Sequence, residues 1–306
     1  MSSLSKTEKI AIFFILLSSM LFSFRSILVK FAYEYGVSTT DLLYYRFLFT
    51  LPLIWSFALF YKKKEFFTRI CNWKIAINTF LAGFFGYYLA TLFDFYSLEK
   101  MNVNVNRVIL YTFPIYVIFW NAILAKSYPK REDIINFVLI EICLLFAIDI
   151  FSEDFLQTSK TGIFFAFLAA ISYSFYYVFN RQIGQKIGSI LFTTYSLSFS
   201  FFFVNIHFFA IYDHQINLSI LSNEALIIII SMAFFCTFLP LLLISEAISL
   251  IGSNRSAIIN SFGPVISIIL SFIILGEIMN FTQILGVGTV LLLLYRIETK
   301  KRNNIN

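Results

Sequence analysis

Ten long apolar stretches, separated by short polar segments, dominate this sequence. They run over residues 10–30, 41–61, 73–96, 102–125, 133–150, 161–181, 189–212, 224–247, 254–275 and 280–296. A helix needs about 20 mostly apolar residues to cross the hydrocarbon core of a bilayer. Ten such helices occupy about two thirds of the 306 residues and leave room only for short loops. We therefore expect an all-α membrane protein with ten transmembrane helices.

The composition excludes several other classes of protein. Apolar residues make up 59 % of the chain and charged residues only 13 %, whereas a soluble domain is roughly 25 % charged. This excludes a disordered chain, a secreted disulfide scaffold and an ordinary cytosolic enzyme. The three cysteines (Cys71, Cys143 and Cys236) lack CxxC spacing and the two histidines are too few for a His-based centre, so we expect no metal and no cofactor.

Lysine and arginine are distributed unevenly between alternate loops. With the N-terminus in the cytoplasm, seventeen of them lie on the cytoplasmic side and three, Lys30, Lys100 and Lys160, on the other. The remaining three lie within or near spans: Arg25, Arg46 and Arg107. The positive-inside rule then predicts that both termini are cytoplasmic. It also explains the net charge of +6 better than a nucleic-acid partner does, and it places the chain in a cell membrane, such as a bacterial inner membrane.

The two halves of the chain match each other at a nearly constant offset. At 151 residues Ser23-Phe24 matches Ser174-Phe175, and at 150 residues Asn104 and Pro114 match Asn254 and Pro264. We expect two repeats, residues 1–150 and 151–306, with five spans each. An odd number of spans makes the two five-helix repeats inverted relative to each other. Inverted repeats are typical of secondary transporters, with the substrate site near the midplane.

The C-terminal stretch 246–294 resembles the EamA family of the drug/metabolite transporter superfamily. The matching features are a helix with a central proline, a Leu-Gly-Glu helix end and a glycine-rich last helix, here Pro264, Leu275-Gly276-Glu277, Gly286 and Gly288. The first half carries a weaker copy, with Arg46 early in its second span and Pro114 within its fourth, but it lacks the Gly-Glu pair at 125–127. The resemblance implies transport of amino acids, purine-like metabolites, sugars or S-adenosylmethionine.

Four charged residues near span ends belong to two hairpins that the inverted repeat relates to each other. Asp94 and Arg107 flank an outer hairpin, and Glu246 and Arg255 flank an inner one. We interpret them as candidate gating residues, since ion pairs broken by entering water close one side at a time. The alternative is that each side chain reaches the headgroups from a helix end.

Several polar residues within spans are candidates for lining a substrate cavity, because a charge at the bilayer centre costs about 2.5–3.5 kcal/mol unless it faces the protein interior. The candidates are Ser23, Arg25, Asp94, Arg107, Tyr111, Ser174, Tyr177, Asn260 and Ser261. Arg25 needs an acidic partner, for which Asp94 is favoured, or an anionic substrate group. Pro114 and Pro264 are expected to break their helices and free a backbone carbonyl. The serines of the ninth span fit close helix packing equally well.

The leading hypothesis is a secondary transporter of small organic metabolites, with amino acid export as one form. No phosphate-binding Gly-rich loop is present, so we do not expect ATP to drive transport. We expect proton exchange or facilitated diffusion instead. Glu141 is a candidate proton site, although burial alone can keep such a carboxyl protonated. The alternative is an intramembrane enzyme acting on a lipid or isoprenoid, which would need clustered carboxylates. The expected partners are the metabolite and the lipid bilayer, and the last span packs either within the bundle or in a homodimer.

Overall fold

We describe a computed structural model of the chain, which covers residues 5–62, 72–129, 131–147, 159–211, 221–275, 281–282, 284–290 and 292–293. All its regular elements are helical, in agreement with the sequence. The first half contains α1 (Lys6–Glu34), α2 (Thr39–Lys62), α3 (Trp73–Leu81), the π-helix η2 (Ala82–Leu89), α4 (Ala90–Lys100), α5 (Val103–Leu110), α6 (Phe113–Leu124) and α7 (Arg131–Ala147). The second contains α9 (Lys160–Phe179), the π-helix η3 (Asn180–Gly184), α10 (Gln185–Ile187), α11 (Ser189–Ile211), α12 (Asn223–Ala233), the π-helix η5 (Phe234–Phe238), α13 (Leu239–Ile251), α14 (Ser253–Asn260) and α15 (Gly263–Leu275).

Seven helices within the described residues are long and apolar enough to cross a membrane. They are Lys6–Glu34, Thr39–Tyr61, Trp73–Lys100, Val103–Leu124, Lys160–Ile187, Ser189–Ala210 and Asn223–Ile251. The fifth expected span is α7, whose apolar part is the shorter Ile134–Phe146. The ninth consists of α14 and α15, and the tenth, 280–296, lies only partly within the described residues. The expectation of an all-helical membrane protein is therefore confirmed.

Polar residues at the helix starts explain where several of these helices begin. The Ser5 hydroxyl accepts a hydrogen bond from the Glu8 N–H while the Glu8 carboxylate accepts one from the Ser5 N–H, both at 3.1 Å. Asn72, Asn102 and Ser222 likewise accept from the first turns of α3, α5 and α12. These caps satisfy N–H groups that no residue within the helix can bond.

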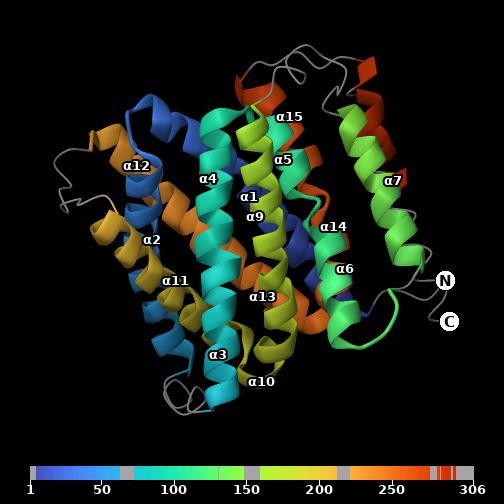
Figure 1. Ribbon diagram of the computed structural model, residues 1–306, viewed down its shortest axis with the longest axis horizontal. Helices are drawn as coiled ribbons and strands as arrows, with labels where there is room; N and C mark the ends of the chain where they lie inside the picture. The colour runs from blue at the N-terminus through green and yellow to red at the C-terminus, as the bar shows by residue number, and fades with distance from the viewer. Residues whose placement is uncertain are drawn as a thin grey trace.

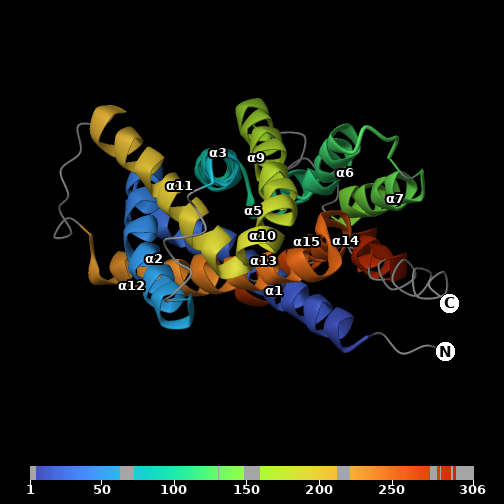
Figure 2. The ribbon, with the colours of Figure 1, turned by 90° about the horizontal axis from the view of Figure 1, so that it is seen from below.

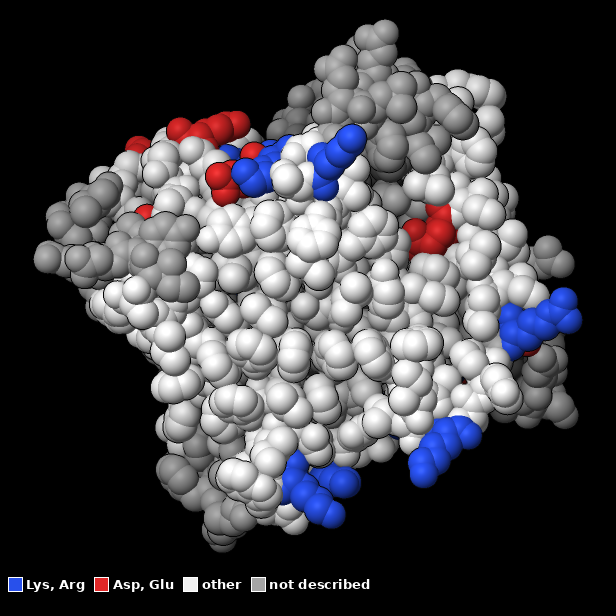
Figure 3. Space-filling view, viewed as in Figure 1, with Lys and Arg blue, Asp and Glu red and all other residues white. Residues whose placement is uncertain are grey.

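Apolar side chains cover the outside of this bundle, and its mostly apolar interior also contains many polar groups. The interior buries many hydroxyls, among them Ser18, Ser19 and Ser23, each with no exposed surface. The outside displays large apolar side chains such as Phe13 and Phe164, which are about three fifths exposed. Charged residues gather mostly along the upper and lower rims of the face seen in Figure 3 and leave much of its middle uncharged. An apolar band between charged rims is what contact with lipid requires.

The first helix of each half packs against the other half. Figure 1 shows α4 and α9 side by side, and Figure 2 shows α1 beside α13. The 150-residue offset relates α1 to α9 and α13 to α4, so these two contacts are equivalents of one another. The helix α2 packs against α11, its own counterpart. The contacts therefore follow the repeat seen in the sequence.

Two features absent from the sequence analysis also follow the repeat. The third and eighth spans each contain a π-helical stretch, η2 and η5, at nearly matching positions. The fourth and ninth spans are each broken by a two-residue turn, at 111–112 and 261–262. We expected Pro114 and Pro264 to break their helices within these spans. The breaks lie just before the prolines, so that Pro114 and Pro264 fall in the first turn of α6 and α15, where the N–H that proline lacks is not needed.

Candidate functional site

Three charged side chains from three helices meet at the end of the bundle that holds the turn between α4 and α5. The Asp94 carboxylate of α4 forms ion pairs with Arg25 of α1 at 2.7 Å and with Arg107 of α5 at 3.4 Å, both through Oδ2. Arg107 also donates from Nε to the hydroxyl of Ser26. Asp94 and Arg107 are only 1 % and 2 % exposed. We call Arg25, Asp94 and Arg107 the arginine cluster. The sequence analysis brought together Asp94, Arg25 and Arg107, and the structure places them in contact.

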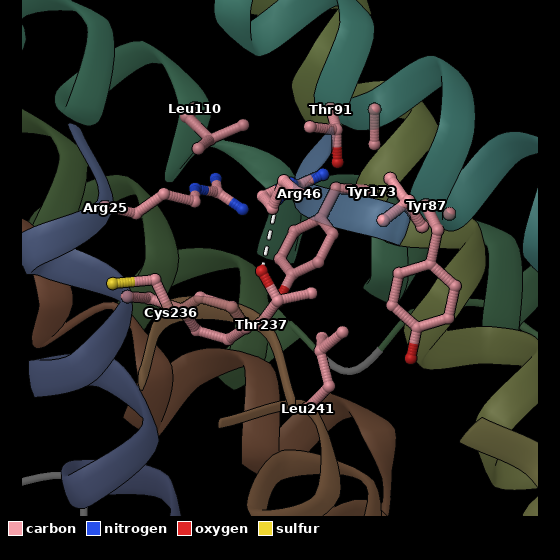
Figure 4. Close-up of a pocket in the computed structure, with 13 residues that line it drawn as sticks. Arg25, Arg46, Tyr87, Thr91, Leu110, Tyr173, Cys236, Thr237 and Leu241 are labelled. Atoms are coloured by element: carbon pink, nitrogen blue, oxygen red, sulfur yellow. Dashed lines mark hydrogen bonds between the residues drawn. The ribbon is translucent and has the colours of Figure 1, made fainter. Parts of the chain in front are cut away.

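A cavity lies beside the arginine cluster, between helices of both halves, and Figure 4 shows several of its lining side chains. Its empty volume is about 420 Å³. It is lined by Phe22, Arg25, Arg46, Phe47, Gly86, Tyr87, Ala90, Thr91, Leu110, Tyr173, Cys236, Thr237 and Leu241. This central cavity is narrow, with room for about one ordered water molecule. Its lining combines charged, hydroxyl-bearing and aromatic side chains.

The π-helical stretches η2 and η5 contribute directly to the central cavity. Gly86 and Tyr87 come from η2, and Cys236 and Thr237 from η5. A π-helical turn contains an extra residue, which redirects side chains and is frequent at functional sites. The Thr237 hydroxyl accepts a hydrogen bond from Arg46 at 3.4 Å and donates to the Met232 carbonyl at 3.0 Å.

A layer of hydrogen bonds begins at Ser19, nearer the start of α1 than the cavity-lining residues Phe22 and Arg25. Asn260 of α14 accepts a hydrogen bond from the Ser19 hydroxyl and donates to the Tyr177 hydroxyl at 2.9 Å. Ser23 donates to the Gly263 carbonyl at 3.0 Å. These bonds join α1 and α9, the first helices of the two halves, to the broken ninth span. Ser23, Tyr177 and Asn260, all cavity candidates from the sequence, therefore form this layer.

The two broken spans cross where each is interrupted. The Tyr111 hydroxyl lies directly against Gly263, so closely that a Cβ at Gly263 would overlap it. Beyond the crossing α5 packs against α15, and α6 packs against α14. Asn121 of α6 donates to Ser253 at 3.0 Å and to Asn254 at 2.6 Å. The crossing therefore depends on the absence of a side chain at Gly263.

A wider hollow lies at the opposite end of the bundle from the arginine cluster. It has an empty volume of about 1040 Å³ and lies between the end of α6, the 125–129 turn and the start of α14, with Arg181 and Arg255 in its wall. We call it the vestibule. Arg181 donates to the Ser249 carbonyl at 3.0 Å and thereby holds the end of α13.

The charged contact beside the vestibule differs from the one suggested by the sequence. We expected Arg255 to act with Glu246, its neighbour across the α13–α14 turn. The acidic partner that the structure gives Arg255 is Glu8, with Nη1 and Oε1 2.6 Å apart, while Glu246 is half-buried on α13. The reason is that α1 packs along α13 and α14 and brings its first turn to Arg255. Glu8 carries no signal of this in the sequence, where it reads as a helix cap.

The remaining sequence candidates are buried but serve their own helices. Ser174 donates to the Ile171 carbonyl at 2.6 Å and Ser261 to the Ala257 carbonyl at 3.4 Å. Of the nine cavity candidates, Arg25 alone is among the residues that line the central cavity, and the polar lining residues that we had not chosen include Arg46, Tyr173 and Thr237. A charged residue inside an apolar span was the signal that pointed to Arg46. No group of three metal-binding side chains occurs in the described part of the chain.

The fold and the site together define a multi-pass helical membrane protein, in which a bundle of apolar spans encloses a small cavity lined from both halves of the chain. The chain belongs to the EamA-like transporter family, which matches residues 9–148 and 160–297. The two matches lie in the two halves of the chain.

Individual relatives agree with this assignment. The chain is 26 % identical over 299 residues to the uncharacterized transporter YcbK of Bacillus subtilis, covering 94 % of this chain and 92 % of that protein. It is 25 % identical over 223 residues to the uncharacterized transporter YdfC of the same organism, covering 71 % and 70 %. One solved crystal structure has the same fold, with a TM-score of 0.72 at 12 % identity, covering 99 % of this chain and all of the other.

Proposed function

We propose that this protein is a secondary transporter that moves a small organic metabolite, an amino acid or a related compound, across the cytoplasmic membrane by alternating access. The observation that carries the proposal is a narrow central cavity, lined from both halves, with buried ion pairs on one side of it and a layer of hydrogen bonds on the other. A binding space enclosed on both sides is the intermediate that alternating access requires.

The arginine cluster acts as the gate at its end of the cavity. Asp94 is shared by Arg25 and Arg107, which lie on different helices, so a movement of α1 relative to α4 and α5 breaks one ion pair and keeps the other. At the vestibule, Glu8 and Arg255 join the starts of α1 and α14 and form the second gate. Opening one gate while the other stays closed exposes the cavity to one side of the membrane.

The membrane orientation that we propose places both termini in the cytoplasm and the two five-helix repeats, 1–150 and 151–306, in opposite directions. The support is the excess of lysine and arginine in alternate loops. Labelling of single cysteines in intact cells tests it, with Tyr128→Cys beside the vestibule and Lys160→Cys at the start of α9, both exposed positions. Lys160→Cys should react from outside and Tyr128→Cys only after permeabilisation. The opposite pattern would reverse the orientation.

Transport itself is tested with purified protein in proteoliposomes and a mixture of amino acids, nucleosides and S-adenosylmethionine. Wild-type protein should move at least one compound faster than empty liposomes do. Arg107→Ala should abolish this movement and leave folded protein in the membrane, and Arg107→Lys should restore it only in part, since lysine lacks the planar guanidinium fork. Near wild-type uptake by Arg107→Ala would show that Arg107 is not part of the transport path.

A further inference from the structure

The guanidinium of Arg46 is buried in the central cavity with most of its hydrogen-bonding capacity unused. Arg46 is 2 % exposed, and its only protein acceptor among the described residues is the Thr237 hydroxyl, 3.4 Å from Nη1. Its Nε and Nη2 atoms have no hydrogen-bond partner in this part of the chain. Buried guanidinium groups remain charged, and unpaired ones are costly. The site therefore lacks an acceptor.

Packing holds this side chain in place without neutralising it. The guanidinium carbon of Arg46 lies 4.8 Å from the centre of the Phe47 ring and 5.0 Å from that of Phe95. Such contacts favour a cation but provide no acceptor for its N–H groups. Figure 4 shows the Arg46 and Arg25 side chains both reaching into the cavity. Two arginines thus border one narrow space.

The protein provides too few negative charges for the arginines around this space. Arg25, Arg46 and Arg107 lie in or beside the cavity, and among the described residues Asp94 is the only acidic side chain paired with any of them. Asp94 already pairs with Arg25 and Arg107. Three guanidinium groups opposed by one carboxylate leave two positive charges in a water-poor interior, where charge interactions are strong.

We propose that the transported substrate is a small organic anion whose carboxylate or phosphate group binds Arg46 in the central cavity, with Arg25 beside it. Two oxygen atoms of such a group match the two free N–H directions of the guanidinium fork. Because the cavity as described has room for about one water molecule, the ligand enters when a gate opens, and the aromatic rings of Phe22, Phe47 and Tyr173 then line the space for the rest of it. This inference rests on the proposed function, because it identifies the cavity as the transport site.

The test uses matched pairs of probes and the purified full-length protein in a neutral detergent and a zwitterionic buffer. The pairs are benzoate with benzamide and glutarate with glutaramide, and phenyl phosphate provides the phosphate arm. Benzoate and glutarate resemble their amides in shape, but they carry a negative charge that the amides lack. We expect at least one anion to raise the apparent unfolding temperature by about 2 °C or more, and its amide not to.

Variants then locate the effect. Arg46→Gln should remove the shift, and Arg46→Lys should reduce it, since a point charge remains without the fork. Arg131→Gln is the matched control, because it removes an arginine that is exposed at the start of α7, and it should leave the shift unchanged. The wild-type comparison of anion with amide stays decisive even where a variant fails to fold.

Three results would overturn the proposal: no anion stabilises the wild-type protein, the amides stabilise it equally, or Arg46→Gln keeps the full shift. The transport assay separates this outcome from failure of the proposed function. Wild-type protein that moves only uncharged or cationic compounds would refute the anionic substrate and leave the transporter in place. Binding of anions without movement of any compound would refute the transport proposal alone.

Discussion

Replacing Asp94 by asparagine removes the one negative charge of the arginine cluster and almost none of its volume. The substitution leaves Arg25 and Arg107 facing an uncharged amide. At an effective dielectric constant of about 20, ion pairs at these distances have Coulomb energies of about 6 and 5 kcal/mol before the cost of removing the charges from water. Because Asp94 and Arg107 are buried, solvent does not compensate for the loss.

The net effect expected for Asp94→Asn is a loss of about 3–5 kcal/mol in the free energy of unfolding, as for a buried ion pair that loses one partner. At about 2 °C per kcal/mol, the apparent unfolding temperature in detergent should fall by about 6 °C or more. Thermal unfolding followed by fluorescence and by loss of the monodisperse elution peak measures it. A variant that unfolds within about 2 °C of wild type would refute the reasoning.

A second substitution separates charge from packing. Asp94→Asn combined with Arg25→Gln removes one negative and one positive charge, so the excess of positive charge returns to that of the wild type. We expect the double variant to be more stable than Asp94→Asn alone, a coupling that a double-mutant cycle measures directly. Strictly additive losses would show that the ion pair contributes little and that Asp94 matters for shape.

Two further predictions concern other parts of the bundle. Glu8→Gln should lower the unfolding temperature by no more than about 2 °C, because its ion pair with Arg255 is partly exposed and such pairs contribute about 0–1 kcal/mol. The same melting assay measures this change. A fall as large as that of Asp94→Asn would contradict the expectation. Gly83→Ala should destabilise the protein by about 1–3 kcal/mol, because its Cβ would meet the Ser196 carbonyl of α11. The matched control is Gly288→Ala, where no described residue offers a contact to the new Cβ within 4 Å and the helix gains about 1 kcal/mol. Equal melting temperatures for the two glycine variants would refute the packing argument.

Much of the fold could be predicted because hydropathy and length determine it directly. An apolar stretch of about 20 residues has few alternatives to a transmembrane helix, and most expected spans agree with described helices to within a few residues. The contact between Asp94 and Arg107 was also predictable. The two lie thirteen positions apart across a short turn, and an intramembrane charge needs a partner.

The features that shape the cavity were not predictable in this way. The π-helical stretches η2 and η5 are apolar like the α-helices around them, so composition does not distinguish them. The partner of Arg255 depends on how α1 lies along α14, a contact between residues 247 positions apart. Arg46 was visible as a charge in an apolar span, but its unpaired state depends on which acids lie nearby in space.

The first helix of each half packs against the other half, and this has a consequence for how the chain is assembled. Because α1 packs along α13, and α9 along α4, neither half completes its own packing surface until the other is present. When the first five spans leave the membrane insertion machinery, Arg25 and Arg107 can already pair with Asp94, but the surface of α4 that later contacts α9 still faces lipid. Two fragments divided between residues 148 and 159 should accordingly recover a working transporter only when made in the same cell. The two parts are thus halves of one folding unit.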